Sequence, residues 1–266
     1  MKRLIFAILY EDGKFILSRN FRKQKIGNLN WLFQNYNLLE VSFGIDEIII
    51  IDTSKNKNKI EFCKIIEKIS EKLFIPITAG GGINNVSDAK VFQESGADKI
   101  LLNKLFYKDP KAWKKIVEKY GKQFIVSCID YKNNKNKIEV YFNEAKKLSN
   151  LSIDDTILSL LKIGTGEIIL QSIDKDGTGM GLDLNIISHI KNLNIACPLI
   201  LLGGVGKPEH ILNGLLNKRI DAVCTTNLFN FIGKSFLQTR EYLISRKLDL
   251  NKWENENFIN YKNKFL

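Results

Sequence analysis

Two clusters of glycine are placed where a backbone could bind an anion. Gly81 and Gly82 follow the apolar segment PITA, and Gly203 and Gly204 follow the apolar segment PLILL. Glycine lets backbone N–H groups approach a phosphate closely, and the N-terminus of a following helix adds a favourable dipole. A tight strand-to-helix turn also favours glycine, so one cluster alone would leave both interpretations open. Two clusters in equivalent positions favour phosphate binding and predict a substrate with a phosphate at each end.

Polar residues at the ends of other apolar runs extend the two candidate phosphate sites. Asn103 ends the run KILLN and would join the first glycine cluster. Thr225 and Thr226 end the last apolar run and would join the second. In α/β barrels, the loops after the seventh and eighth strands often form the phosphate site.

The two halves of the chain repeat each other at a nearly constant offset. The matching pairs are AILYED from Ala7 with CIDYKN from Cys128, EIII from Glu47 with EIIL from Glu167, PITAGGGI from Pro76 with PLILLGGV from Pro198, and GADKI from Gly96 with RIDAV from Arg219. Their offsets are 121, 120, 122 and 123 residues. Such a repeat predicts two similar halves of four strand–helix units and a pseudo-twofold site where they meet.

The elements that would position these residues alternate regularly along the chain. Eight short apolar runs, each followed by an amphipathic stretch, predict a parallel sheet covered by helices, and eight strands are enough to close a barrel. We therefore expect an α/β fold, a (β/α)8 TIM barrel made of two (βα)4 halves. An open doubly wound sheet would normally carry G-x-G-x-x-G after its first strand, where this chain reads YEDGKF.

The expected strands are Leu4–Leu9, Glu47–Asp52, Pro76–Ala79, Lys99–Asn103, Phe124–Asp130, Glu167–Ser172, Leu199–Leu202 and Ala222–Thr226. The expected helices are Cys63–Leu73, Lys111–Tyr120, Asp155–Leu161, Leu184–Ile190, Pro208–Leu216 and Lys234–Ile244. The segment Tyr131–Asn143 interrupts the alternation and predicts a hairpin insertion. We expect residues 1–246 to form the barrel, which typically takes about 250 residues, and residues 247–266 to form a polar C-terminal tail.

Composition indicates which classes of partner and cofactor this protein is expected to have. The net charge is +11, but the lysines are scattered among asparagine and isoleucine, which predicts solvated faces and no nucleic-acid partner; a basic surface still favours a phosphorylated substrate. No stretch of 18 residues is free of charge, so no membrane span is expected. The four cysteines lie far apart and there are two histidines, so we expect reduced thiols in a cytoplasmic protein and neither a metal ion nor another cofactor.

Several longer segments resemble a known family. They are GIDEIIIID at Gly44–Asp52, ITAGGGI at Ile77–Ile83, GADKILLN at Gly96–Asn103, SIDKDGTGMGLD at Ser172–Asp183 and LGGVGKPEHI at Leu202–Ile211. Over about residues 1–245 the chain is similar to the cyclase subunit of imidazole glycerol phosphate synthase. The resemblance implies a one-to-one complex with a glutaminase, whose ammonia travels along the barrel axis to a bisphosphorylated ribulosyl substrate. It also places Asp176 and Gly177, within SIDKDGT, among the phosphate-binding residues.

The resemblance further implies two catalytic aspartates, acting as general acid and base at the ends of strands one and five. Asp130 matches the second, whereas Leu9 occupies the position of the first, and the internal repeat pairs the same two residues. A leucine cannot transfer a proton, and losing such a group typically removes about 10²–10⁴-fold of rate. Leu17 stands where the family has a loop lysine. Glu11 or Asp12 could replace the missing carboxylate only with a shift of the chain.

The family also guards the floor of the barrel with four charges through which ammonia passes. Their equivalents are Arg3, Glu47, Lys99 and Glu167, and Asp98 lies near the face that would dock the glutaminase. Charges at the starts of apolar strands are costly unless they pair, and two cations with two anions can do so. A purely structural plug of salt bridges remains the alternative.

Three functions fit this combination. The first is a cyclase subunit of the imidazole glycerol phosphate synthase type in histidine biosynthesis, which Leu9 puts in question. The second is a paralogue that supplies ammonia for amidination of a nucleotide-linked surface sugar. The third is a non-catalytic protein that only activates a glutaminase.

Overall fold

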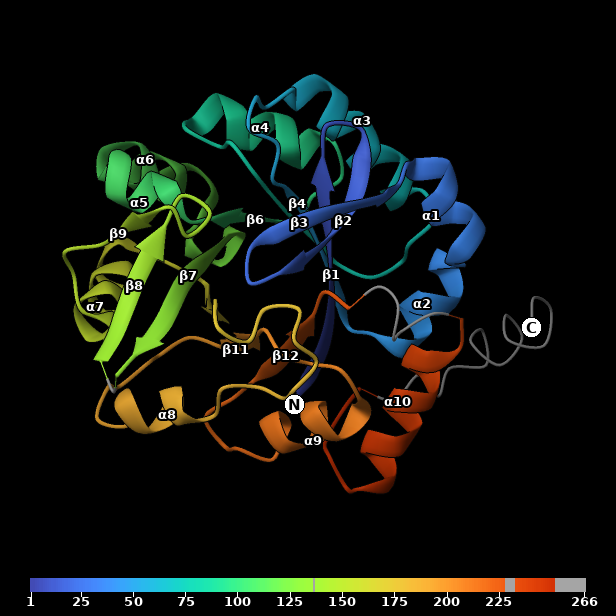
Figure 1. Ribbon diagram of the computed structural model, residues 1–266. Helices are drawn as coiled ribbons and strands as arrows, with labels where there is room; N and C mark the ends of the chain where they lie inside the picture. Colours follow the sequence, from blue (N-terminus) through green and yellow to red (C-terminus); the bar gives the residue numbers. More distant parts are fainter. Residues whose placement is uncertain (136, 228–232, 252–266) are drawn as a thin grey trace.

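Eight parallel strands close into a barrel in the computed structural model, which describes residues 1–135, 137–227 and 233–251 (Figure 1). The order around the ring is β1–β4–β5–β6–β7–β10–β11–β12, and β1 pairs with β12 to close it. The strands are β1 (Arg3–Glu11), β4 (Glu47–Asp52), β5 (Ile77–Gly80), β6 (Lys99–Leu102), β7 (Ile125–Asn134), β10 (Glu167–Ser172), β11 (Leu199–Leu202) and β12 (Ala222–Thr225). The expected TIM barrel is confirmed, with each strand within a few residues of its predicted position.

Helices surround this ring of strands on its outer side (Figure 1). They are α1 (Leu29–Asn35), α2 (Leu38–Gly44), α3 (Lys59–Ser70), α4 (Val86–Glu94), α5 (Lys104–Lys108), α6 (Pro110–Tyr120), α7 (Ile153–Ile163), α8 (Asn185–His189), α9 (Pro208–Leu215) and α10 (Ser235–Ser245). Helix α3 begins four residues before its predicted start because the Asn58 side chain accepts a hydrogen bond from the Glu61 amide, which caps the helix there. The sequence patterns did not predict α1, α2, α4 or α5.

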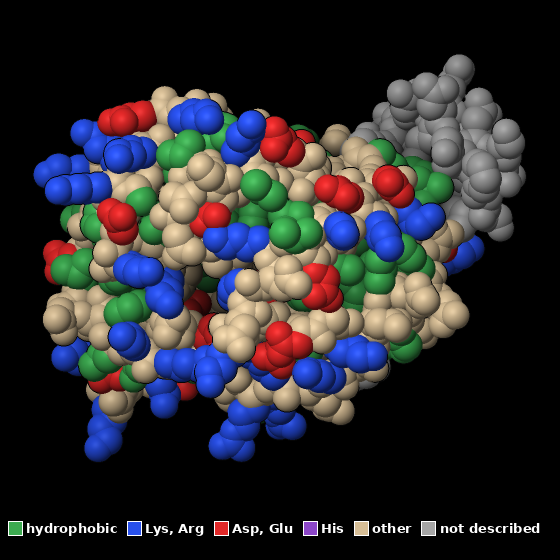
Figure 2. Space-filling view, turned by 90° about the horizontal axis from the view of Figure 1, so that it is seen from above, with side chains coloured by type: hydrophobic (Ala, Val, Ile, Leu, Met, Phe, Trp, Pro, Cys, Tyr) green, Lys and Arg blue, Asp and Glu red, His purple; other side chains and the backbone are tan. Residues whose placement is uncertain are grey.

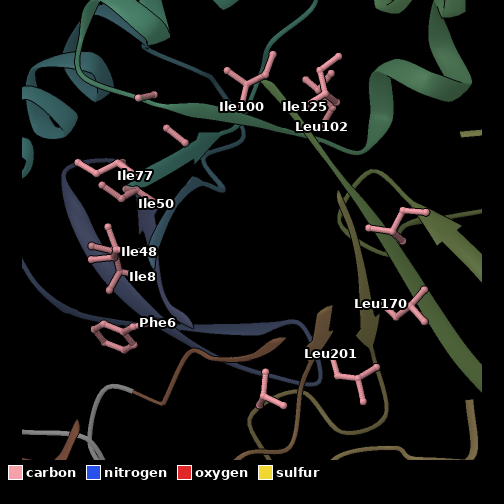
Figure 3. Close-up of a cluster of buried hydrophobic side chains, with 14 of the residues drawn as sticks. Phe6, Ile8, Ile48, Ile50, Ile77, Ile100, Leu102, Ile125, Leu170 and Leu201 are labelled. Atoms are coloured by element: carbon pink, nitrogen blue, oxygen red, sulfur yellow. The ribbon is translucent and has the colours of Figure 1, made fainter. Parts of the chain in front are cut away.

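Each barrel strand is buried on both faces, which explains why the strands read as continuous apolar runs. Outward side chains pack under the helices around the ring (Figure 3); among them are Phe6, Ile8, Ile48, Ile50, Ile77 and Leu170. A separate cluster fills the interior: Ile5, Ala7, Ile49, Leu101, Val126, Cys128, Ile169, Ile200, Leu202, Ala222 and Cys224. The interior is therefore a packed core, as is usual in this fold.

Two hairpins extend from the mouth, meaning the end of the barrel where the strands finish. Strand β1 turns at Asp12 and Gly13, both with positive φ, into β2 (Lys14–Arg19) and β3 (Arg22–Gly27). We call residues 14–27 the mouth hairpin, which lies across the opening in Figure 1. Strand β7 continues into β8 (Lys137–Phe142), followed by the short β9 (Lys147–Leu148). This second hairpin was predicted, whereas the mouth hairpin was not.

The chain beyond α10 returns to the opposite end of the barrel, which we call the floor. The Lys2 amide donates to the Asp249 carbonyl at 2.8 Å, and Lys2 forms a parallel bridge with Leu250. Leu250 is buried, so the first residues of the predicted tail pack against the N-terminus. The rest of that predicted tail, residues 252–266, lies outside the described residues.

The surface carries basic side chains over a wide area. Figure 2 shows lysine and arginine mixed with acidic and hydrophobic side chains on one face, without a single-sign patch. None of the described helices is long and apolar enough to cross a membrane.

Removing the buried Arg240 side chain should destabilise the barrel. Its guanidinium forms a two-point contact with Asp46 at 2.6 and 3.1 Å, and Asp46 also accepts the Leu4 amide at 2.8 Å. Because Arg240→Ala leaves Asp46 without its cation in a buried site, the free energy of unfolding should fall by about 3 kcal/mol. Urea denaturation measures this, and Arg246→Ala, at the exposed C-cap that directly follows the same helix, is the control. Equal losses in the two variants would contradict the prediction.

Candidate functional site

Four charged side chains form a closed ring of salt bridges at the floor. Arg3 contacts Glu47 at 3.1 Å and Glu167 at 2.8 Å. Lys99 contacts the same two carboxylates, each at 2.7 Å. The four residues predicted from the sequence are thus brought together, and each ion pairs with both ions of opposite charge.

Burial and ion pairing shift the pKa values of Glu167 and Arg3 in opposite directions. Burial alone would raise the pKa of Glu167, but hydrogen bonds and charges from Arg3 and Lys99 outweigh it and lower that pKa. Burial likewise opposes the charge of Arg3, yet Glu167 and Glu47 raise its pKa. Thr78 donates a further hydrogen bond to Glu47 at 2.5 Å. The ion pairs therefore favour the charged forms of Glu167 and Arg3 and hold the ring together.

Aspartates that precede barrel strands accept hydrogen bonds from backbone amides at the edge of the floor. The Asp98 carboxylate accepts the Ile77 amide at 2.8 Å, and the Asp221 carboxylate accepts the Leu199 amide at 2.8 Å. Asp98 is exposed on this face, where the sequence analysis expected it. Its carboxylate also has a structural role, because it satisfies the first amide of a neighbouring strand.

A cavity of about 440 Å³ lies at the mouth, on the side of strands β5, β6 and β7. The predicted residues Gly81, Gly82, Asn103 and Asp130 line it together with Leu9. Five lysines that the sequence analysis did not single out also line it: Lys23, Lys55, Lys57, Lys104 and Lys108. Lys55 and Lys57 directly follow a barrel strand, so their position in the chain could have identified them.

Asp130 is the one carboxylate lining this cavity that makes no ion pair within the described chain. Asp52 pairs with Lys57, and Glu144 pairs with Lys23. Burial raises the pKa of Asp130 to about 7, although hydrogen bonds from Cys128, Ala145 and Asn103 oppose the shift. A carboxyl group that titrates near neutral pH can both accept and donate a proton, which suits general acid–base chemistry.

Asn103 orients this carboxyl group. Its side-chain amide donates to Asp130 at 3.3 Å and to the Cys128 carbonyl at 3.0 Å, while its oxygen accepts the Asn143 amide at 3.1 Å. We expected a phosphate ligand here, but the whole Asn103 side chain is engaged by strand β7 and its hairpin.

Of the described acidic residues next to Leu9 in the sequence, neither Glu11 nor Asp12 takes the place of the missing aspartate. Leu9 projects into the cavity beside Ile16 and Ile51 and is only 9% exposed. Glu11 forms an ion pair with Lys23 at 2.9 Å and does not line the cavity; nor does Asp12, which sits in the turn before β2. The same Lys23 ammonium contacts Glu144 at 3.2 Å, so it bridges the mouth hairpin to the segment after β8. Leu17, at the family's lysine position, lines a second cavity instead.

That second cavity, of about 250 Å³, lies on the side of strands β11 and β12. Its lining includes all the residues predicted for the second phosphate site except Asp176: Gly177, Gly203, Gly204, Thr225 and Thr226. It also includes Arg19 and Arg22 of the mouth hairpin, which the sequence analysis did not identify.

Asp176 contacts the mouth hairpin, and its expected part in phosphate binding stays a prediction. Its buried carboxylate accepts hydrogen bonds from the Ser18 hydroxyl at 2.5 Å and the Phe21 amide at 2.9 Å. Its carbonyl accepts the Asn20 amide at 2.9 Å. Because the Asp176 carboxylate accepts these hydrogen bonds, it holds the mouth hairpin in place, and its negative charge would repel a phosphate.

The two glycine turns have the geometry of anion sites. Gly81 and Gly203 have φ values of +119° and +111°, and their neighbours Gly82 and Gly204 also have positive φ. A Cβ on Gly81 would lie 2.4 Å from the Asp52 carbonyl oxygen, so only glycine fits there. Within the described part of the chain, no acceptor takes the backbone amides of these four glycines. The described residues include no group of three or more side chains arranged to hold a metal ion.

The raised pKa of Asp130 predicts a pH-dependent gain in stability for Asp130→Asn. A free aspartate titrates near 4, so between about pH 4 and 7 the folded protein holds a proton that the unfolded chain releases. The stability due to the neutral acid is lost as the pH rises through 7. At pH 8, Asp130→Asn should therefore be the more stable form, by on the order of 3 kcal/mol. Urea denaturation from pH 8 to pH 4 measures this difference, which should vanish at the acidic end; a constant difference would refute the shift.

Known proteins match the chain over the whole barrel. A family model described as "Histidine biosynthesis protein" matches residues 3–233. A protein of Parasynechococcus marenigrum named "Putative imidazole glycerol phosphate synthase subunit hisF2" is 42% identical over 241 residues, which are 90% of this chain and 89% of that protein. Proteins named imidazole glycerol phosphate synthase subunit HisF from Clostridium botulinum and Dehalococcoides mccartyi are each 34% identical, over 91% and 77% of this chain and 95% and 81% of their own lengths. The chain therefore belongs to the HisF family, whose members are subunits of imidazole glycerol phosphate synthase.

Proposed function

We propose that this protein is a synthase subunit that receives ammonia from a glutaminase at its floor and uses it on a phosphorylated substrate at its mouth. The observation that carries the proposal is the alignment of two features on one barrel axis. The four-charge ring lies at the starts of the strands, and the cavity with Asp130 lies at their ends. Arg3 and Leu9 are six residues apart on β1, roughly 20 Å of strand.

The floor ring suits a gate for a small neutral molecule. Its two cations and two anions cancel, so the ring has no net charge to attract an ion, and above it the interior is apolar, with the small side chains Ala7 and Ala222. The Arg3 and Lys99 side chains are 22% and 17% exposed, so they reach solvent and can swing outward without crossing the core. A glutaminase seated on this face would deliver ammonia directly to the ring.

The two cavities support a substrate with two anionic ends. Each contains a glycine turn with unpaired amides and at least two cationic side chains. A protein that only activated a glutaminase would need neither cavity, so the third function considered above is disfavoured.

Asp130 is the acid–base residue in this proposal. With a pKa of about 7 it can transfer protons at neutral pH without a second carboxylate beside it. Cyclase chemistry of the imidazole glycerol phosphate synthase type would then proceed on one carboxyl group, and more slowly than with two.

A second candidate is that the same ammonia serves another phosphorylated acceptor, such as a nucleotide-linked sugar that becomes amidinated. The observation in its favour is the apolar surface made by Leu9, Ile16 and Ile51, which faces Asp130 across the larger cavity. The higher identity to the protein named hisF2 than to the two named HisF agrees with a separate branch.

An assay with ammonium salt separates the two candidates. The purified protein should convert the ribulosyl bisphosphate substrate of imidazole glycerol phosphate synthase, and Asp130→Asn should lower the rate by about 10²–10⁴-fold because the acid–base group is lost. Glu118→Gln, an exposed acid-to-amide change on α6, is the matched control. Substrate binding without turnover would favour the second candidate.

Restoring the first carboxylate tests whether Leu9 alone limits this chemistry. Leu9→Asp should raise the turnover with ammonium at least tenfold, since one positioned acid or base is worth about 10²–10⁴-fold. Leu9→Asn introduces a side chain with the same shape as aspartate that cannot transfer a proton, so this variant should stay at the wild-type rate. Equal rates for the two variants would mean that other parts of the cavity have diverged.

A further inference from the structure

The tip of the mouth hairpin places two arginines side by side. Arg19 and Arg22 are cross-strand partners at the end of the β2–β3 ladder, joined through Asn20 and Phe21, whose φ values are +50° and +61°. Like charges directly opposite each other on paired strands are destabilising. Their placement therefore needs a compensating anion.

The part of the chain that the structure describes supplies no such anion at this position. Both arginines are exposed, and neither makes an ion pair or a side-chain hydrogen bond with any described residue. Both line the smaller cavity, whose described lining contains no aspartate or glutamate. The larger cavity differs, since three carboxylates stand among its lysines.

The hairpin tip is held firmly above this cavity. Ser18, Asn20 and Phe21 all bond to Asp176, and the Asn20 side chain also reaches the Ile173 and Asp174 carbonyls, each at 3.2 Å. Two exposed arginines on a loose loop would have no defined position, whereas here five hydrogen bonds from the neighbouring residues Ser18, Asn20 and Phe21 hold the tip.

We propose that Arg19 and Arg22 clamp a phosphoryl group of the substrate from above, against the Gly203–Gly204 turn. This inference rests on the proposed function, which puts a phosphate at that turn, and adds the hairpin as the second half of its site. A guanidinium presents a planar fork of donors that matches phosphate oxygens, so two of them select a dianionic phosphate end. The amides below and the forks above then contact different oxygens of one group.

Inorganic phosphate, titrated at constant ionic strength, is the probe. Amide chemical shifts in NMR spectra report each site separately, with Gly203 and Gly204 for the smaller cavity and Gly81 and Gly82 for the larger. The double variant Arg19→Ala/Arg22→Ala should raise the dissociation constant read at Gly203 and Gly204 by about tenfold or more, because charge-assisted hydrogen bonds are lost. The constant read at Gly81 and Gly82 should stay unchanged.

Two control variants sharpen the result. Lys25→Ala removes a charge from the same hairpin, but Lys25 is exposed and lines neither cavity, so its effect should be under twofold. Arg19→Lys/Arg22→Lys keeps both charges without the forks and should fall between the wild type and the alanine variant. An unchanged constant in the alanine variant would overturn the clamp while leaving the phosphate site intact. If phosphate shifts Gly81 and Gly82 but never Gly203 and Gly204 in the wild type, the second phosphate site and the clamp both fail.

Discussion

Closing eight strands into a ring is the constraint on which the rest of this molecule depends. Alternate residues of every strand then point into an interior in which each layer is filled by side chains from every second strand. Unpaired charge is not tolerated in the middle layers, which hold side chains such as Ile5, Ile169 and Ile200. Charged and polar groups are confined to the two ends, where Arg3 and Lys99 pair with two glutamates and where the buried Asp130 lines the larger cavity. The separation of floor from mouth follows from closure alone.

The internal repeat gives the two ends partial twofold symmetry, and one place where that symmetry fails is the acid–base position. Glu47 and Glu167 occupy equivalent positions, as do the two glycine turns, and a hairpin leaves the first strand of each half. Leu9 and Asp130 are also equivalent, but one is apolar and the other is an acid with a pKa near neutrality. In the proposed chemistry, proton transfer would therefore take place on the Asp130 side of the mouth, with an apolar side chain opposite.

The strands were predictable because burial on both faces leaves a run of apolar residues that needs no long-range information. The floor ring was predicted from the family resemblance, and each of its members lies at the start of a barrel strand. Helix α3 was misplaced at its start because its cap, Asn58, lies outside the apolar pattern.

The mouth hairpin escaped prediction for a different reason. Its second strand, RKQKIG, has no alternating pattern, and its position is fixed by Asp176, more than 150 residues away. Only the folded chain reveals that Asp176 holds a hairpin and that Arg19 and Arg22 reach the far cavity.

The unequal anchoring of that hairpin has a consequence for the order of events at the mouth. Over the larger cavity it is tied by the Lys23 bridge, whose side chains are about one-fifth exposed or more, and such pairs are worth about 1 kcal/mol or less. Over the smaller cavity the hairpin is held by hydrogen bonds to the buried Asp176 carboxylate. Thermal motion breaks the first tie far more often than the second. The hairpin therefore opens on the Lys23 side and stays in place on the Asp176 side. A molecule that spans both cavities would come free first at the Lys23 side and last at the Asp176 side.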